Sequence, residues 1–446
     1  MFSIIPNNMT ISTIILSPSA FFDGEMEQIK QIRSVRFGVK TIEVKVNFME
    51  STDIKDIVLS KNIIDSLGIP ITCYYDILIK NNELVIGPFI GILTDFTNKK
   101  TAEMLPTYNS FVKEYKRIGG AIIIFSLEGI NMENRTVSGF LYQPGKSSWI
   151  YGTFYYPAAV MSILEASLTS KWEEFHTKLQ HLISILGPKV FNYPHFSKWE
   201  MYNLLQHNLG EILPKTILYN DVKDIAEMVN SFGSVYIKPL NGRLGKKIYK
   251  VIKDGENIVV LFDHNRDKQI RFFTNEPEIR EFFQEELVSD MFLIQQTIPL
   301  MKFDDRVIDF RLMAVKNEKG LWENLGIFSR MGSKGNIVSN ITAGGETEAA
   351  DKTLKKVWKL TDEEIIKIKA QIGRVAKEAL VLLEKNGYHL GNIGFDIGLD
   401  ENLLIYIIEI NHQNPDPYIA LKANNKSTFY FARFKNMLYA RHLAGF

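Results

Sequence analysis

The sequence predicts a multidomain chain of mixed α+β and α/β class, in which the C-terminal half is rich in antiparallel strands. Residues 1–86 contain short apolar runs with period-two alternation, and residues 87–190 contain continuous apolar strands separated by helix-compatible sequence. Beyond residue 190, capped helices alternate with strand pairs. Because 446 residues are too many for one ordinary domain, we predict three domains, at 1–86, 87–190 and 191–446.

The first predicted domain is small and β-rich. The apolar residues Ile42, Val44, Val46 and Phe48 alternate with polar neighbours, which predicts one half-buried strand through this stretch. Later in the domain, two neighbouring asparagines at 81 and 82 separate two further apolar runs, and this composition is typical of a turn between strands.

The second domain is predicted to have a parallel sheet. Residues 90–93 and 121–125 are apolar throughout, and the stretch between them is compatible with a helix. A strand, a helix and a second strand that is apolar on both faces are typical of a parallel α/β unit. Gly119 and Gly120 precede the second of these strands, and residues 157–168 are predicted to form an amphipathic helix.

Helix-capping signals organise the third domain. Ser197 and Glu200 form a capping box that predicts the start of one helix, and Asn220 is the predicted cap of the next. Thr361 and Glu364 repeat the capping-box pattern before a long amphipathic segment. Between these helices, strands are expected to dominate.

The composition excludes several classes of function. The chain has 52 Lys and Arg against 51 Asp and Glu, so no general attraction to nucleic acid or anionic membranes is expected. One cysteine, Cys73, allows neither an intramolecular disulfide nor a cysteine-based zinc cluster. Without a long apolar run near the N-terminus, a cytoplasmic location is expected. The basic and aromatic run 429–443 is interpreted as a helix that docks on the protein.

A hairpin within residues 392–415 carries a candidate metal site. Two strands flank a polar turn at residues 400–402, which would place Asp396 opposite Glu409, with Asn411 on the same face as Glu409. Hard oxygen ligands of this kind suit Mg²⁺ (or Mn²⁺), which also binds substrate phosphates. The alternative is a surface hairpin with three solvated polar residues.

A candidate phosphate-binding loop follows the strand that ends at Lys238. Gly242 and Gly245 would let the backbone approach a phosphate closely, and Lys246 adds positive charge. The flanking apolar residues place Lys238 at the edge of a sheet. The loop lacks the Walker pattern and leads into a strand, so an ordinary basic hairpin is the alternative.

Residues 291–298 form a third candidate, an apolar strand that stops at Gln295 and Gln296. The backbone groups at such a strand end could bind the edge of an adenine, with Ile298 against the ring. The alternative is a core strand with a polar exit.

Two arginines could bind anions. Asp309 and Arg311 share one face of a predicted strand, where an arginine held beside an acid can clamp phosphate or carboxylate. The alternative is a cross-strand ion pair, which contributes little to the stability of the fold when it lies on the surface. Arg330 and Asn340 offer further polar groups in a glycine-rich stretch, which could equally be a loop without a binding role.

The histidines predict no metal site. His176 and His181 do not share a helix face, and His195, His389 and His412 stand apart from other ligand types in the sequence.

Taken in this order, the motifs resemble the ATP-grasp superfamily, and the sequence is similar to its YheC/YheD-type, endospore coat-associated proteins. The resemblance follows residues 190–420 motif by motif. It implies an ATP-grasp fold for the third domain and a pre-ATP-grasp-like domain at residues 87–190.

The resemblance also implies roles for individual residues. Lys198 and Lys238 would contact the nucleotide, with the loop from Gly242 through Gly245 to Lys246 as the lid over its phosphates. Gln295, Gln296 and Ile298 would form the adenine hinge. Arg311, Arg330 and Asn340 would face the transferred phosphate and the substrate, and Asp396, Glu409 and Asn411 would bind the metal.

The activity implied by the resemblance is that of an ATP- and Mg²⁺-dependent ligase, which joins a carboxylate to an amine through an acylphosphate. Small-molecule or peptide substrates, spore coat proteins as partners and a spore coat association are implied as well. The alternatives are a small-molecule kinase of the same fold and a non-catalytic, nucleotide-binding coat protein. Two departures from the family pattern concern Leu300, where relatives have a glutamate for the ribose, and the residues 412–415, which replace a shorter Pro-Gly turn.

Overall fold

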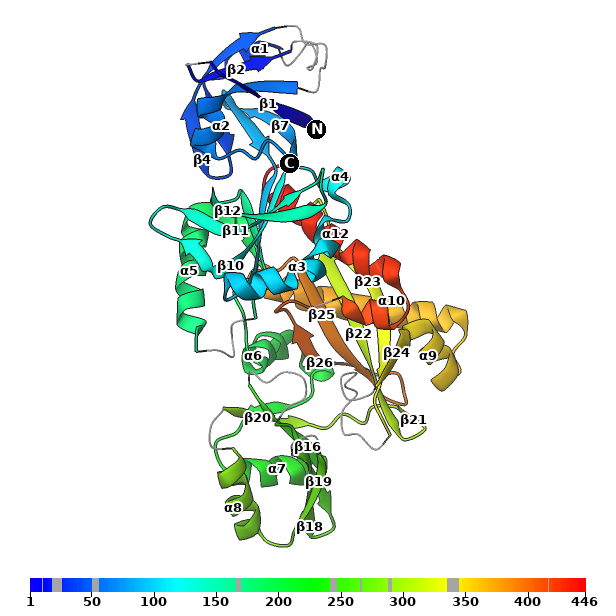
Figure 1. Cartoon of the computed structure of the whole chain (residues 1–446). Coiled ribbons are helices and arrows are strands. Elements are labelled where there is room, and N and C mark those ends of the chain that lie inside the picture. The colour runs from blue at the N-terminus through cyan, green and yellow to red at the C-terminus, as the bar shows by residue number, and fades with distance from the viewer. Residues whose placement is uncertain are drawn as a thin grey trace.

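A computed structural model describes residues 1–9, 11–17, 26–49, 56–165, 170–240, 247–264, 267–287, 291–334, 345–415 and 417–446. Within these ranges the strands form one eight-stranded and three six-stranded sheets. The molecule is elongated, with the N-terminal sheet at one end and the sheet that contains β16 and β20 at the other (Figure 1). The multidomain α+β organisation predicted from the sequence is therefore confirmed, and the exact domain boundaries stay a prediction.

The N-terminal sheet has the strand order β4-β3-β8-β7-β1-β6-β2-β5. Its elements are β1 (Phe2–Asn7), β2 (Thr13–Leu16), α1 (Met26–Lys30), β3 (Ser34–Phe37), β4 (Lys40–Glu43), β5 (Lys45–Phe48), β6 (Asp56–Ser60), α2 (Lys61–Leu67), β7 (Tyr74–Lys80) and β8 (Glu83–Gly87). The single strand predicted around Val44 is wrong. The Val44 amide donates to the carbonyl of Arg33 at 2.9 Å, and the chain changes partner there, since β4 pairs with β3 and β5 with β2.

The second sheet has the order β12-β11-β10-β9-β13-β14. Its elements are β9 (Phe89–Asp95), α3 (Asn98–Val112), α4 (Tyr115–Ile118), β10 (Ala121–Asn131), β11 (Thr136–Gln143), β12 (Ser148–Tyr155), β13 (Ala159–Ser162), α5 (Trp172–Leu186), the 3-10 helix η3 (Gly187–Lys189) and β14 (Val190–Phe191). The predicted parallel pairing of β9 with β10 is confirmed, while β11 and β12 add antiparallel strands and make the sheet mixed.

The helix predicted at residues 157–168 is wrong where the structure describes it. Residues of β13 pair in parallel with both β9 and β14, and all four are buried. An amphipathic helix would have left one face in water, whereas an inner strand of a covered sheet is apolar on both faces.

The third sheet is antiparallel, with the order β15-β20-β16-β17-β18-β19. The elements are α6 (Lys198–Leu209), η4 (Gly210–Ile212), β15 (Thr216–Leu218), α7 (Val222–Phe232), β16 (Ser234–Pro239), β17 (Tyr249–Asp254), β18 (Asn257–His264), β19 (Asp267–Phe273), α8 (Glu276–Glu286) and β20 (Phe292–Gln296). Lys238 therefore lies near the end of an inner strand, so its predicted place at a sheet edge is wrong. The cap of α7 is Asp221, one residue beyond the predicted Asn220.

The fourth sheet follows the order β24-β23-β22-β25-β26, with β21 beside β22. The elements are β21 (Lys302–Phe303), β22 (Arg306–Lys316), β23 (Trp322–Met331), β24 (Glu346–Ala349), α9 (Ala350–Val357), α10 (Asp362–Lys385), β25 (Asn392–Leu399), β26 (Ile405–Asn411), α11 (Tyr418–Lys422) and α12 (Lys426–Leu443). One face packs Phe310 and Phe395 against Leu205 of α6 and Ile372 of α10.

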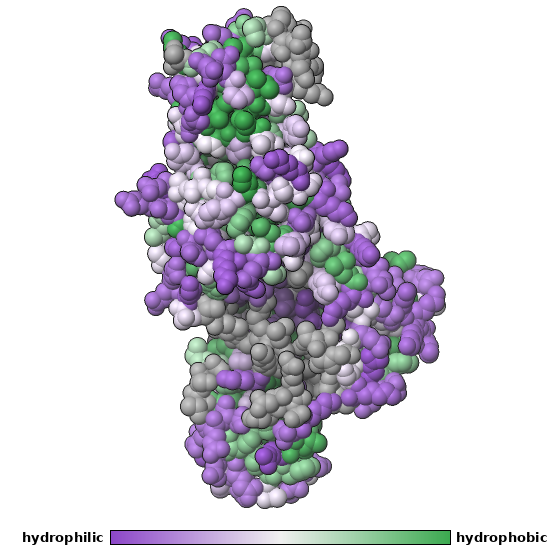
Figure 2. Space-filling model, viewed as in Figure 1, coloured by the Kyte–Doolittle hydropathy of each residue, from purple (hydrophilic) through white to green (hydrophobic). Residues whose placement is uncertain are grey.

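Local signals fix the starts of two helices as predicted. Complete capping boxes join Ser197 to Glu200 at α6 and Thr361 to Glu364 at α10. Figure 2 shows hydrophilic side chains gathered over α9 and the adjoining end of α10, in agreement with the exposed pair of Lys355 and Asp362 there.

Helix α12 docks on the protein, as predicted, and links distant parts of the chain. Phe434 and Met437 pack with Ile90 of β9 and Phe111 of α3. Arg441 donates to the carbonyl of Ile118 and to Asp76, both at 2.7 Å, so the helix reaches the N-terminal sheet (Figure 1). Of the helices in the described ranges, none is both long and apolar enough to cross a membrane.

Gly120 lies where the start of β10 passes close to Pro88, and a substitution there tests how much this close approach contributes to stability. Its φ is +74°, and an added Cβ would overlap the Pro88 carbonyl oxygen, which accepts the Ala121 amide at 2.9 Å. We expect Gly120→Ala to lower the free energy of unfolding by about 2–4 kcal/mol. Gly145→Ala, where nothing lies within 4 Å of the added Cβ, should be nearly neutral. Urea unfolding followed by circular dichroism measures both, and equal effects would contradict the explanation.

Candidate functional site

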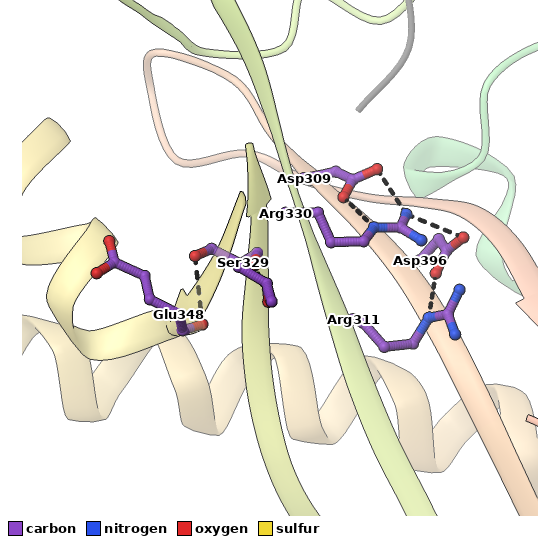
Figure 3. A network of polar contacts seen from close by, with 7 residues as sticks. Asp309, Arg311, Ser329, Arg330, Glu348 and Asp396 are labelled. Carbon is purple, nitrogen blue, oxygen red and sulfur yellow. Dashed lines mark hydrogen bonds and ion pairs between the residues drawn. The ribbon is translucent and has the colours of Figure 1, made fainter. Parts of the chain in front are cut away.

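The strand register of the fourth sheet brings the predicted arginines and carboxylates together. Arg311 of β22 is paired with Asp396 of β25, and Asp309 with Arg330 of β23. Asp396 is in turn paired with Glu409 of β26, as the predicted hairpin requires. Because alternate residues of a strand share a face, these side chains all lie on the face opposite the helix-covered core, as Figure 3 shows for Asp309, Arg311, Arg330 and Asp396.

Arg330 is the centre of this polar network. Its Nε and Nη2 donate to the two oxygens of Asp309, each at 2.6 Å, and Nη2 also lies 3.0 Å from Asp396 Oδ2. Burial opposes the charge on Arg330, but Asp309 and Asp396 outweigh it and raise the pKa of the guanidinium. Figure 3 shows the two acids on either side of this guanidinium.

Asp396 is shared between the two arginines. Its Oδ1 accepts from Arg311 Nε at 2.5 Å, and its Oδ2 faces Arg330. Burial alone would raise the pKa of Asp396, but Arg311 and Arg330 hold that pKa below its ordinary value. Asp309 and Asp396 are only 4% and 6% exposed, so these are buried ion pairs and not the weak surface pairs of the alternative interpretation.

The predicted metal ligands Glu409 and Asn411 lie beside Asp396 on β26. Glu409 Oε1 is 3.4 Å from the Lys198 ammonium, and Asn411 is paired with Gly394 of β25. The Asn411 amide nitrogen is buried without a hydrogen-bond partner among the described residues. Of the three predicted ligands, the structure therefore places the two carboxylates directly opposite one another and the amide two residues further along β26.

Asp396, Glu409 and Asn411 fit a hard divalent cation only together with oxygen atoms from a bound nucleotide or from water. Within the described ranges, no three His, Cys, Asp or Glu side chains converge on a metal site. Two carboxylates and an amide, completed by phosphate oxygens and water, are the kind of ligand set that Mg²⁺ accepts.

Lys238 of β16 faces the same site from the third sheet. Its ammonium donates to Gln295 Oε1 at 2.7 Å. Burial lowers the pKa of Lys238 to about 8, although Glu409, Asp396 and Asp309 favour its charged form. The cation and the carboxylates thus approach one another across the space between two sheets.

The predicted hinge residues have protein partners for their side chains. The Gln295 side chain lies between Lys238 and the Thr216 hydroxyl, to which its Nε2 donates at 3.2 Å. Gln296 Oε1 accepts the Lys215 amide at 3.1 Å. Ile298 is 9% exposed and lies just beyond the strand. The backbone amide of Gln296 also donates to the carbonyl of Lys215, at 2.8 Å, so both side-chain and backbone groups of the predicted hinge are engaged within the sheet.

Leu300, at the position where the family resemblance implies a glutamate for the ribose, has a packing role. It forms a bridge with Asp400, and a Cβ on Gly398 of β25 would overlap its side chain. The leucine thus fills the space left by the glycine and connects the predicted hinge to the predicted metal-binding hairpin.

Two of the histidines that look isolated in the sequence meet beside the site. His412 stacks on Phe196 with ring centroids 3.6 Å apart, and His195 lies 5.5 Å from His412. Burial lowers the pKa of His195 to about 4. The position of His412 directly after Asn411 was the only sequence signal that could have drawn attention to it.

A pocket next to Arg311 adjoins the network. It is a small hollow, open to solvent, between β22, β25 and α12, with Asn392, Pro415 and Asn436 in its walls. Four predicted site residues, Gly242, Gly245, Lys246 and Asn340, lie outside the described residues.

The buried network should be essential for stability. Arg330→Met would leave Asp309 buried without its guanidinium, which should lower the free energy of unfolding by about 3–5 kcal/mol. The exposed pair of Lys334 and Asp304, with side chains 66% and 61% exposed, provides the control. Lys334→Met should cost less than about 1 kcal/mol. Urea unfolding compares the two, and similar losses would contradict the distinction between buried and exposed pairs.

Comparisons with known proteins identify the family of this chain. A family model described as "YheC/D like ATP-grasp" matches residues 187–443. The chain is 30% identical to the endospore coat-associated protein YheD of Bacillus subtilis over 390 residues, which cover 84% of this chain and 83% of YheD. A glutathione synthetase of Agrobacterium fabrum is 24% identical over 40% of this chain and 47% of its own length.

The ATP-grasp ligase PsnB, solved with Mg, ADP and a phosphomimetic precursor variant, aligns with a TM-score of 0.43 and 15% identity over 80% of this chain and 99% of its own. The family match covers more than half of the chain and contains every predicted site residue. The chain belongs to the YheC/D-like ATP-grasp family.

Proposed function

We propose that this protein is an ATP- and Mg²⁺-dependent ligase that joins a carboxylate to an amine through an acylphosphate. The observation that carries the proposal is the buried network of Asp309, Arg311, Arg330 and Asp396, which faces Lys238 across the site. In a chain of the ATP-grasp family, such a network is suited to hold the phosphates of a nucleotide.

The charges of the site support an anionic ligand. Four cationic side chains, Lys198, Lys238, Arg311 and Arg330, meet three carboxylates, Asp309, Asp396 and Glu409. The excess of positively charged side chains favours a phosphate-bearing ligand. Guanidinium groups bind phosphate through two parallel hydrogen bonds.

Asp396, Glu409 and Asn411 would hold the metal ion, which neutralises phosphate charge when it is bound. The chain's own residues would position the phosphates and stabilise the charge that develops in the transition state. Arg311 and Arg330 are well placed for this role, because their partners Asp309 and Asp396 fix them on neighbouring strands before the ligand arrives.

The proposed reaction has two steps. A substrate carboxylate oxygen attacks the γ-phosphorus, and the bond to ADP breaks, which gives an acylphosphate and ADP. An amine then attacks the acyl carbon; phosphate leaves, the amine loses a proton, and an amide remains. Neither step requires a protein nucleophile, so positioning and charge neutralisation account for the catalysis.

Relatives support the ligase over its alternatives. Glutathione synthetases are among the matching proteins, whereas a coat scaffold would not need buried arginines fixed beside two carboxylates. The name of the YheD relative supports a proposed association with the spore coat and its proteins. We propose a cytoplasmic site of action on small-molecule or peptide substrates, with no nucleic-acid partner.

Product analysis tests the reaction. With Mg²⁺, ATP and a panel of amino acids and short peptides, the protein should release ADP and phosphate and form an amide that mass spectrometry detects. Glu409→Gln should reduce turnover by at least about a hundredfold, while Glu401→Gln in the exposed turn of the same hairpin should not. AMP and pyrophosphate as products would contradict the acylphosphate, a phosphoester would indicate a kinase, and absence of Mg-ATP binding in calorimetry would indicate a scaffold.

The lowered pKa of Lys238 predicts how nucleotide affinity depends on pH. With a pKa of about 8, Lys238 loses its proton as the pH rises through that value, and a neutral amine attracts phosphate less strongly. Mg-ATP affinity should therefore fall about tenfold between pH 7 and 9. Lys238→Arg keeps its charge over this range, so its affinity should change little. Isothermal titration calorimetry at several pH values measures both, and parallel profiles would exclude Lys238 as the titrating group.

A further inference from the structure

The segment before helix α6 connects the two sheets that flank the site. The Lys198 amide donates to the carbonyl of Leu240 at 3.3 Å, two residues beyond Lys238. The Phe196 amide donates to His412 Nε2 at 3.0 Å, directly after the predicted metal ligand Asn411. Residues 196–198 are therefore hydrogen-bonded on one side to the sheet of Lys238 and on the other to the sheet of the carboxylates.

The side chain of His412 is suited to this contact. It is 5% exposed and stacks on Phe196, with the ring planes 21° apart. Because Nε2 accepts a backbone N–H, this nitrogen carries no proton, and the neutral ring carries its proton on Nδ1. Phenylalanine would keep the stacking and lose the acceptor, whereas the amide oxygen of glutamine can occupy a place close to that of Nε2.

The contact with His412 is not needed to start helix α6. The capping box of Ser197 and Glu200 already satisfies the first amides of the helix. What the hydrogen bond to His412 determines is where the start of α6 lies relative to β26. Lys198 follows at once in the chain, and its ammonium lies 3.4 Å from Glu409.

We propose that His412 is a positioning residue, which fixes the start of α6 on β26 so that Lys198 stays aligned with Glu409 and with the phosphates of a bound nucleotide. This inference rests on the proposed function. His412 would act only through Lys198, without contact to the nucleotide.

A double-mutant cycle with Mg-ATP titration tests this role. His412→Phe should weaken binding about tenfold, the effect of one lost hydrogen bond with a buried donor left unpaired, and His412→Gln should restore most of it. His207→Gln, at an exposed histidine later in α6, is the control and should bind as the wild type does. If His412 acts through Lys198, adding Lys198→Met to the wild-type protein should weaken Mg-ATP binding strongly. Adding the same substitution to the His412→Phe variant should weaken binding much less.

Hydrogen exchange of the nucleotide-free protein gives a second readout. The amide of Phe196 should exchange faster in His412→Phe and regain protection in His412→Gln, while the peptides of α10 remain unchanged. Additive effects of the His412 and Lys198 substitutions, or unchanged exchange at residue 196, would overturn the inference while leaving the proposed function intact. A wild-type protein that does not bind Mg-ATP would overturn the proposed function itself, and with it the role of His412 in nucleotide binding.

Discussion

The ion pairs of Arg330 with Asp309 and Asp396 are the interaction on which the site depends. Charges buried as deeply as these cost free energy unless their partners are in place with good geometry. The antiparallel register of β22, β23 and β25 meets that requirement, because it sets each guanidinium opposite a carboxylate. The same pairing leaves the network rigid before any ligand arrives, and rigid charges are effective in binding and catalysis because they need not be reorganised.

The site lies between two antiparallel sheets, and its function depends on how they are held together. Lys238 and Gln295 belong to the third sheet, and Asp396 and Glu409 to the fourth. Leu300 packs on Gly398 at one connection between them. Residues 196–198 form another, through the carbonyl of Leu240 and the ring of His412. Small contacts outside the polar network therefore determine whether the cation of one sheet meets the carboxylates of the other.

Much of the site could be predicted because the relevant signals are local. Side-chain alternation placed Asp309 and Arg311 on one face, and the polar turn at residues 400–402 set Asp396 opposite Glu409. Predictions failed where a distant partner decides the conformation. Residues 159–162 form a strand because β9 and β14 flank them. The predicted strand is interrupted at Val44 because the residues before it pair with β3 and the residues after it pair with β2.

The sequence by itself determined the order of the motifs, the starts of α6 and α10 and the register of the hairpin of β25 and β26, since each depends on residues close together in the chain. Only the tertiary structure decided that Arg330 is shared between two acids, that Gln295 holds Lys238, and that His412 meets Phe196. Phe196 and His412 are 216 positions apart in the sequence. Contacts over such distances depend on how whole sheets pack, and no local pattern of residue types encodes that arrangement.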